Sequence, residues 1–70
     1  MKATFLNEYS DMQWLADTHF PQAKRFLYGS AMLYGNEDCP EKVELWGDNN
    51  PRHDQKPDLT VTSEDWDRIP

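Results

Sequence analysis

The stretch THFPQAKRFLYGSAMLYG, residues 18–35, decides how the rest of this chain is interpreted. Its apolar side chains recur at three- and four-residue steps, which is the spacing of one face of an α-helix. Asp17 or Thr18 can cap the start, and Gly35 favours the left-handed backbone that ends helices. We therefore predict one full-length helix over residues 18–35. The apolar members of the stretch are Phe20, Ala23, Phe26, Leu27, Ala31, Leu33 and Tyr34.

Gly29 falls in the middle of this predicted helix. As a helical residue it would weaken the helix by about 1 kcal/mol relative to alanine. The alternative is that its missing side chain lets another backbone approach closely.

The other segments are short and are typical of strands and turns. Residues 2–8 and 12–16 alternate loosely and predict an N-terminal hairpin, and residues 42–46 predict a third strand. Residues 59–62 are a candidate fourth strand, and Ser63 can cap a single helical turn. The predicted class is α+β, a small antiparallel sheet of three to four strands with one helix packed on one face, in the order β-β-α-β-(β). The expected core is Trp14, Phe20, Ala23, Leu27, Ala31, Val43 and Leu45.

Seventy residues make a single small domain, residues 1–70, with a narrow margin of stability. Residues 47–58 are polar and contain two prolines, which predicts a flexible loop, and residues 63–70 form a short acidic tail. One cysteine, Cys39, excludes an internal disulfide bond. With no leader and no run of membrane-spanning length, a cytoplasmic location is expected and no membrane partner. A homo-oligomer stays open.

The net charge of −6 lies entirely in the second half of the chain. Residues 1–35 hold three acids and three bases, whereas residues 36–70 hold ten acids and four bases. An acidic surface repels phosphate, so no direct binding of nucleic acid is expected. It favours a basic partner surface, and the alternative is that the acids serve solubility alone.

No pattern for catalysis or cofactor binding stands out. Cys39, His53 and Asp54 lack the paired spacing of a zinc site, and we predict no metal and no cofactor. The acids around Cys39 disfavour a reactive thiolate. The prediction is therefore a protein that is not an enzyme.

Aromatic side chains set among acids are the stronger signal, because such residues anchor protein interfaces. Trp46 and Trp66 are the two tryptophans in this setting, and each has the alternative of covering its own small core. The predicted partner-binding residues are Glu37, Asp38, Glu41, Glu44, Trp46, Glu64, Asp65, Trp66 and Asp67.

Residues 1–46 resemble small phage-encoded inhibitor proteins. The likeness is carried by the strand that follows Met1-Lys2-Ala3, by the strand predicted over residues 12–16, and by the tetrapeptide QAKR, residues 22–25. The similar proteins are type I anti-CRISPR proteins and inhibitors of host RNA polymerase built from a three-stranded sheet and one helix. The resemblance implies a stoichiometric inhibitor that docks on a larger bacterial nucleoprotein complex. The acidic residues 36–70 depart from the more basic members that contact guide RNA.

The predicted function is thus a non-catalytic inhibitor, encoded by a phage or mobile element, that blocks a basic nucleic-acid- or protein-binding surface in the host cytoplasm, as a DNA mimic does. The alternative is a small accessory or regulatory subunit of a bacterial enzyme complex.

Overall fold

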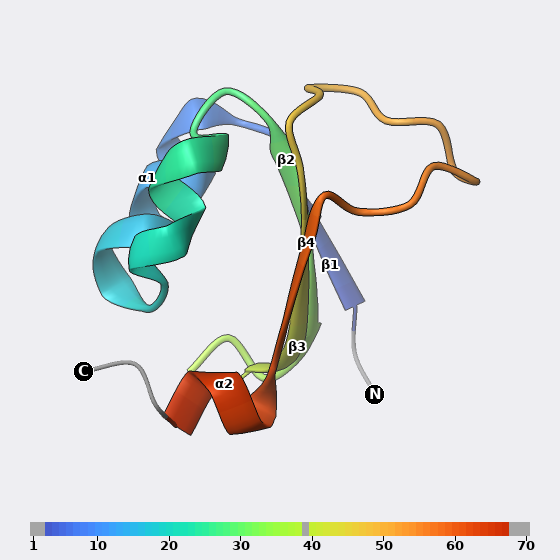
Figure 1. Cartoon of the computed structure of the whole chain (residues 1–70). Coiled ribbons are helices and arrows are strands. Elements are labelled where there is room, and N and C mark those ends of the chain that lie inside the picture. The colour runs from blue at the N-terminus through green and yellow to red at the C-terminus, as the bar shows by residue number, and fades with distance from the viewer. Residues whose placement is uncertain (1–2, 39, 68–70) are drawn as a thin grey trace.

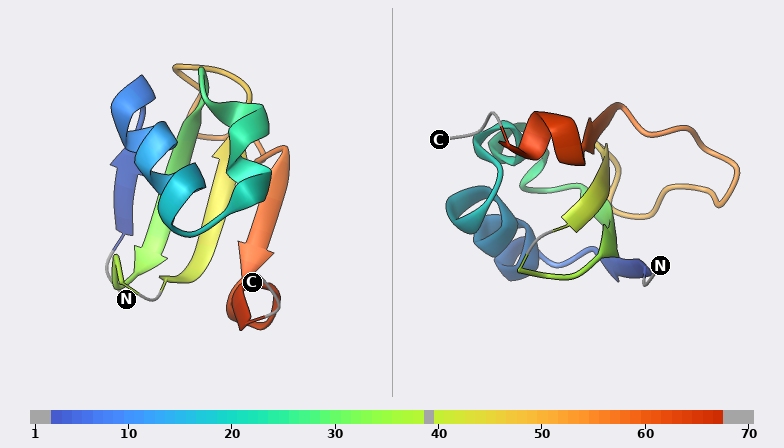
Figure 2. Two further views of the ribbon diagram at one scale, coloured as in Figure 1. Left: turned by 90° about the vertical axis from the view of Figure 1, so that its left-hand side faces the viewer. Right: turned by 90° about the horizontal axis from the view of Figure 1, so that it is seen from below.

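The computed structural model describes residues 3–38 and 40–67, and for Trp66 and Asp67 it describes the backbone alone. Four antiparallel strands form one sheet in the order β1-β2-β3-β4 (Figure 2). The strands are β1 (Ala3–Leu6), β2 (Ser30–Gly35), β3 (Pro40–Trp46) and β4 (Leu59–Thr62). The order of the strands in the sheet is therefore the same as their order in the sequence.

Helices cover one face of this sheet, which leaves the other face to a loop. Between β1 and β2 the chain forms α1 (Tyr9–Thr18) and the 3₁₀ helix η1 (Pro21–Phe26). After β4 it forms the short α2 (Ser63–Asp67). Figure 1 shows α1 and η1 on one side of the sheet and the loop of residues 47–58 projecting from the other. The predicted class, a small α+β fold with an antiparallel sheet and a helix on one face, is confirmed.

The predicted helix over residues 18–35 is wrong. Its first part folds as η1, and its second part, from Ser30, is the central strand β2. In β2 the side chains of Ala31 and Leu33 are buried while those of Met32 and Tyr34 are only half-buried. That alternation is the period of a strand, and it was hidden because residues 31–34 are all apolar.

The true α-helix is α1, where a second strand was predicted over residues 12–16. Met12, Leu15 and Ala16 are buried and stand at the three- and four-residue steps of a helix face. Trp14 falls between these steps, so it is 40 % exposed and is not the predicted central core residue. Its ring instead meets the His19 ring edge to face, with centroids 5.2 Å apart. The order along the chain is therefore strand, helix, 3₁₀ helix, three strands and a short helix, rather than the predicted β-β-α-β-(β).

Gly29 shows why the chain leaves η1 and enters β2. Its amide closes a tight turn by donating to the carbonyl of Phe26 at 2.8 Å. A Cβ at this position would overlap the carbonyl oxygen of Trp46. The alternative in which Gly29 permits a close backbone approach is thus the correct one, and it seats the first residue of β2 opposite Trp46.

The core lies between the helices and the sheet. Of the predicted core, only Leu27 and Trp14 are not fully buried: Leu27 packs partly buried at its edge. The core is completed by residues outside the predicted set, from α1 (Met12, Leu15 and Ala16), η1 (Phe26), β2 (Leu33) and β4 (Val61). Its buried members are Met12, Leu15, Ala16, Phe20, Ala23, Phe26, Ala31, Leu33, Val43, Leu45 and Val61.

The C-terminal half agrees with the predicted segments. The strands over residues 42–46 and 59–62 are confirmed as β3 and β4, and a helical turn begins at Ser63. Asp65 accepts hydrogen bonds from the Thr62 amide and hydroxyl, at 3.4 and 3.2 Å, which fastens that turn to β4. Within the described ranges no helix has both the length and the apolar character that a membrane crossing needs.

Candidate functional site

The predicted partner-binding residues divide into two groups in the structure. One group lies at a single end of the sheet, which we call the acidic end. It is formed by Glu37, Asp38, Glu41, Glu64 and Asp65. Glu44 and Trp46 lie apart from it, further along β3. The side chains of Trp66 and Asp67 fall outside the described part of the chain, so their predicted role stays a prediction.

The strand register creates the acidic end. Gly35 pairs with Pro40 where β2 turns into β3, and Lys42 pairs with Thr62 where β4 runs into α2. The β2–β3 turn and α2 therefore lie at the same end of the molecule (Figure 1). Glu37, Glu41 and Glu64 are exposed, and they form no ion pair with any other described residue.

Trp46 is not an exposed anchor, because the loop of residues 47–58 covers it. It points to the face of the sheet opposite the helices and is only 8 % exposed. Its indole Nε1–H donates to the carbonyl of Gln55 at 3.0 Å. Of the two alternatives for this residue, the structure favours the covering of a small core of its own.

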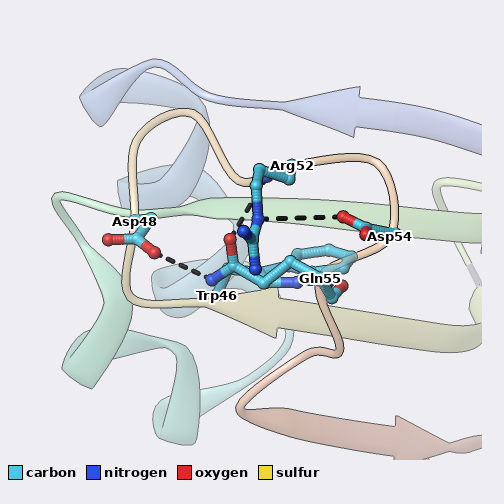
Figure 3. Close-up of polar contacts among 5 residues, drawn as sticks. All are labelled: Trp46, Asp48, Arg52, Asp54 and Gln55. Atoms are coloured by element: carbon cyan, nitrogen blue, oxygen red, sulfur yellow. Dashed lines mark hydrogen bonds and ion pairs between the residues drawn. The ribbon is translucent and has the colours of Figure 1, made fainter.

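The loop itself is held by a set of polar contacts centred on Gln55 (Figure 3). The Gln55 amide group donates to Asp48 at 2.8 Å, and its oxygen accepts from the Arg52 amide at 3.2 Å. Both ends of the loop are also bonded, since Gly47 donates to the Asp58 carboxylate at 2.7 Å and the Asp58 amide donates to Leu45 at 2.8 Å. The predicted flexibility of residues 47–58 stays a prediction, and these bonds argue against it.

The buried hydroxyl of Ser30, at the start of β2, holds the loop of residues 47–58 against the sheet. Ser30 is fully buried and donates to the carbonyl of Asp48 at 2.9 Å. Because a buried hydroxyl must find a partner, this bond fixes where the loop leaves β3.

Beneath the loop lies a groove of about 400 Å³ on the face of the sheet that the helices leave open. We call it the open-face groove. Its floor consists of Phe5, Met32, Tyr34, Glu44 and Trp46, and residues 51–57 form its overhanging wall. Aromatic walls with a few polar groups are typical of binding sites, and the volume lies within their usual range.

Glu44 supplies the charge on the floor of the groove. It is half-buried, and one carboxylate oxygen accepts a hydrogen bond from the Tyr34 hydroxyl at 2.6 Å. That hydrogen bond, together with burial and the nearby negative charge, raises the pKa of Tyr34. The Lys42 ammonium lies 4.3 Å from the centroid of the Tyr34 ring rather than in an ion pair with Glu44.

Residue placement gives little support to catalysis. His53 and Asp54 lie on the loop, and among described residues no three His, Cys, Asp or Glu side chains gather as metal ligands. Cys39, named above for both metal binding and nucleophilic chemistry, lies outside the described residues. The expectation that the protein is not an enzyme stays a prediction.

Sequence reasoning missed the open-face groove, although it named Glu44 and Trp46. The other floor residues come from β1 and β2, and Met32 and Tyr34 belong to the stretch that was expected to be helical. A strand period in residues 30–35 would have placed Met32 and Tyr34 on the face that Glu44 shares. Comparison of the chain with protein-family models, with curated proteins and with solved structures gives no match.

Proposed function

We propose that this protein is a non-catalytic binding protein whose acidic end docks on a basic surface of a larger bacterial protein or nucleoprotein complex. The observation that carries the proposal is the gathering of the exposed Glu37, Glu41 and Glu64 carboxylates at one end of the sheet, where none of the three forms an ion pair with a described residue. Such a field attracts a basic surface and speeds encounter.

The resemblance to phage-encoded inhibitors suggests what such docking would do in the cell. A protein that occupies the basic surface of a nucleoprotein complex competes with the nucleic acid that the surface normally binds. We therefore propose a stoichiometric inhibitor of the anti-CRISPR or host-takeover type, acting in the cytoplasm of the host cell. Its own net charge of −6 makes direct binding to nucleic acid unfavourable.

The test compares two triple variants of the tagged protein in affinity capture from bacterial lysate, followed by surface plasmon resonance with the purified partner. Each variant removes three negative charges, so that net charge is matched. The acidic-end variant is Glu37→Gln, Glu41→Gln and Glu64→Gln. The control variant, called the α1 variant, changes two residues of α1 and the residue that precedes it: Asp11→Asn, Asp17→Asn and Glu8→Gln.

We expect the acidic-end variant to associate roughly tenfold more slowly than the wild type, with the deficit shrinking as salt is raised. The association rate of the α1 variant should fall much less. If the association rates of both variants fall equally, net charge alone explains the effect and the acidic end is not the docking site. If neither variant changes binding at either salt concentration, the proposal is also wrong.

The accessory-subunit alternative predicts the same contact with an opposite consequence. Added to its purified partner complex, an inhibitor lowers activity until one equivalent is bound, whereas an accessory subunit maintains or raises it. Titration of the complex with wild-type protein separates the two.

A further inference from the structure

We propose that the open-face groove receives an arginine side chain from an extended segment of the partner protein. The groove is separate from the acidic end, which is formed by the β2–β3 turn, the first residues of β3 and α2. We take a basic partner from the proposed function, on which this inference rests.

The first reason is the state of Glu44. Its carboxylate is half-buried on the groove floor, and the Tyr34 hydroxyl at 2.6 Å satisfies one of its two oxygens. Within residues 3–38 and 40–67 no basic group lies within ion-pair distance of it. A carboxylate shielded from water gains more from a cationic partner than an exposed one does, because screening is weaker there.

The second reason is the arrangement of aromatic rings around that carboxylate. Phe5 pairs with Met32 and Met32 pairs with Glu44, so these three residues form one row across β1, β2 and β3. Tyr34 stands two residues from Met32 on the same face, which makes it a diagonal neighbour of Phe5. Side chains in diagonal positions stand roughly 7–8 Å apart, which leaves room for a planar group between them.

The third reason is that Tyr34 already holds a cation. The Lys42 ammonium sits 4.3 Å from the centroid of its ring, so the ring offers a face to positive charge. A guanidinium suits an aromatic groove with a carboxylate better than an ammonium does, because it is planar, stacks on aromatic faces and donates several hydrogen bonds in one plane.

Two lysine or arginine side chains, Arg52 and Lys56, also line the wall of the groove, and both are exposed. Arg52 is paired with Asp54, at 3.7 Å between Nε and Oδ1, and both side chains are largely exposed (Figure 3). Exposed charges are screened by solvent, so the half-buried carboxylate dominates the floor. At about 400 Å³ the groove also has room for the backbone beside the arginine, which favours a peptide segment as the occupant.

The experiment is an NMR titration of ¹⁵N-labelled full-length protein with blocked Gly-Arg-Gly. The matched probes are the same tripeptide with citrulline, which keeps the shape but is neutral, and a thymidine oligonucleotide. Glu44→Gln removes the groove charge and retains an oxygen to accept from Tyr34. Glu37→Gln, on the acidic end, is the control variant.

We expect the arginine peptide to shift the Trp46 indole N–H and the amides of Phe5 and Tyr34. Citrulline should bind at least about tenfold more weakly, because its ureido group can still donate to Glu44 but carries no positive charge, so the ion pair is lost. Glu44→Gln should weaken the arginine peptide by a similar factor, and Glu37→Gln by less than about twofold. An unchanged spectrum outside the groove shows that Glu44→Gln remains folded, and the citrulline comparison needs no variant at all.

Four outcomes would overturn the assignment. They are equal affinity for arginine and citrulline, equal effects of the two glutamate variants, shifts centred on the acidic end, and groove shifts caused by the oligonucleotide but not by the arginine peptide. Because the tripeptides are used without the partner, a failure here leaves the test of the acidic end intact, and the reverse also holds.

Discussion

Replacing Gly29 with alanine should destabilise this protein far more than replacing Gly47. The two glycines stand at opposite ends of the same close approach, where β2 begins and β3 ends. A Cβ at Gly29 would overlap the Trp46 carbonyl oxygen and stand 3.0 Å from its carbon and 3.2 Å from the Gly47 carbon. All three contacts are to backbone, so no side chain can swing away to relieve them.

The magnitude follows from what must move. Ordinary contact of a Cβ begins near 3.4 Å, so the backbone of residues 46 and 47 has to withdraw from β2. That withdrawal opens the pairing of Ser30 with Trp46 and strains the Ser30 bond to the loop. Overpacking of this kind costs about 1–3 kcal/mol, and the lack of a flexible neighbour places Gly29→Ala near 3. A domain of this size has roughly 3–5 kcal/mol in total.

Urea denaturation and thermal melting measure the effect. A loss of about 3 kcal/mol lowers the melting temperature of so small a domain by roughly 12–24 °C. At Gly47 the nearest atom to a new Cβ is the Asp58 carboxylate at 3.4 Å, an ordinary contact. Gly47→Ala should therefore change stability by less than about 1 kcal/mol and can even raise it. Equal melting temperatures for the two variants would refute the close approach.

Three further predictions follow from burial and hydrogen bonding. Leu15→Ala should cost about 2–5 kcal/mol in urea denaturation because Leu15 is fully buried, and an unchanged midpoint would remove α1 from the core. Stability should fall as pH rises past about 10, because the raised pKa of Tyr34 means that the folded state holds the phenol proton more tightly; below pH 10 this contribution is complete. Tyr34→Phe should lack that extra loss above pH 10, and an identical pH profile would show that the bond from Tyr34 to Glu44 does not form. In hydrogen exchange, the amides of Arg52 and Gln55 should exchange more than about tenfold slower than in an unstructured chain, and Gln55→Ala should abolish the difference at Arg52; unprotected amides would instead support a flexible loop.

The sequence predicted the strands whose apolar residues are separated by polar ones. In β3, Val43 and Leu45 alternate with Lys42 and Glu44, so only one period fits. In β2 the residues on both faces are apolar, because the second face forms the floor of the groove, and a helix fits equally well. The misplaced helix and the missed groove thus have the same cause.

The position of α1 was lost through a similar ambiguity. Met12, Trp14 and Ala16 alternate as in a strand, while Met12, Leu15 and Ala16 follow a helix face. The burial of Met12, Leu15 and Ala16 identifies the segment as a helix. The pattern of five residues in the sequence does not distinguish a helix from a strand. The candidate site could not be predicted for a further reason. Contacts such as that of Trp46 with Gln55 join a strand to an irregular loop, and no local sequence pattern predicts them.

The unequal connections between neighbouring strands have a kinetic consequence for the groove. A short turn connects β2 to β3, and one loop connects β3 to β4. The connection from β1 to β2 is longer, because it contains α1 and η1. Because closing a longer loop costs more entropy, we expect the β2–β3 hairpin to form early and β1 to be added late. The strand added last is also expected to detach first in local opening. Phe5, which lies on β1, is therefore expected to join the floor of the groove last and to leave it first. The lifetime of the pairing between β1 and β2 would then determine how long the groove stays complete.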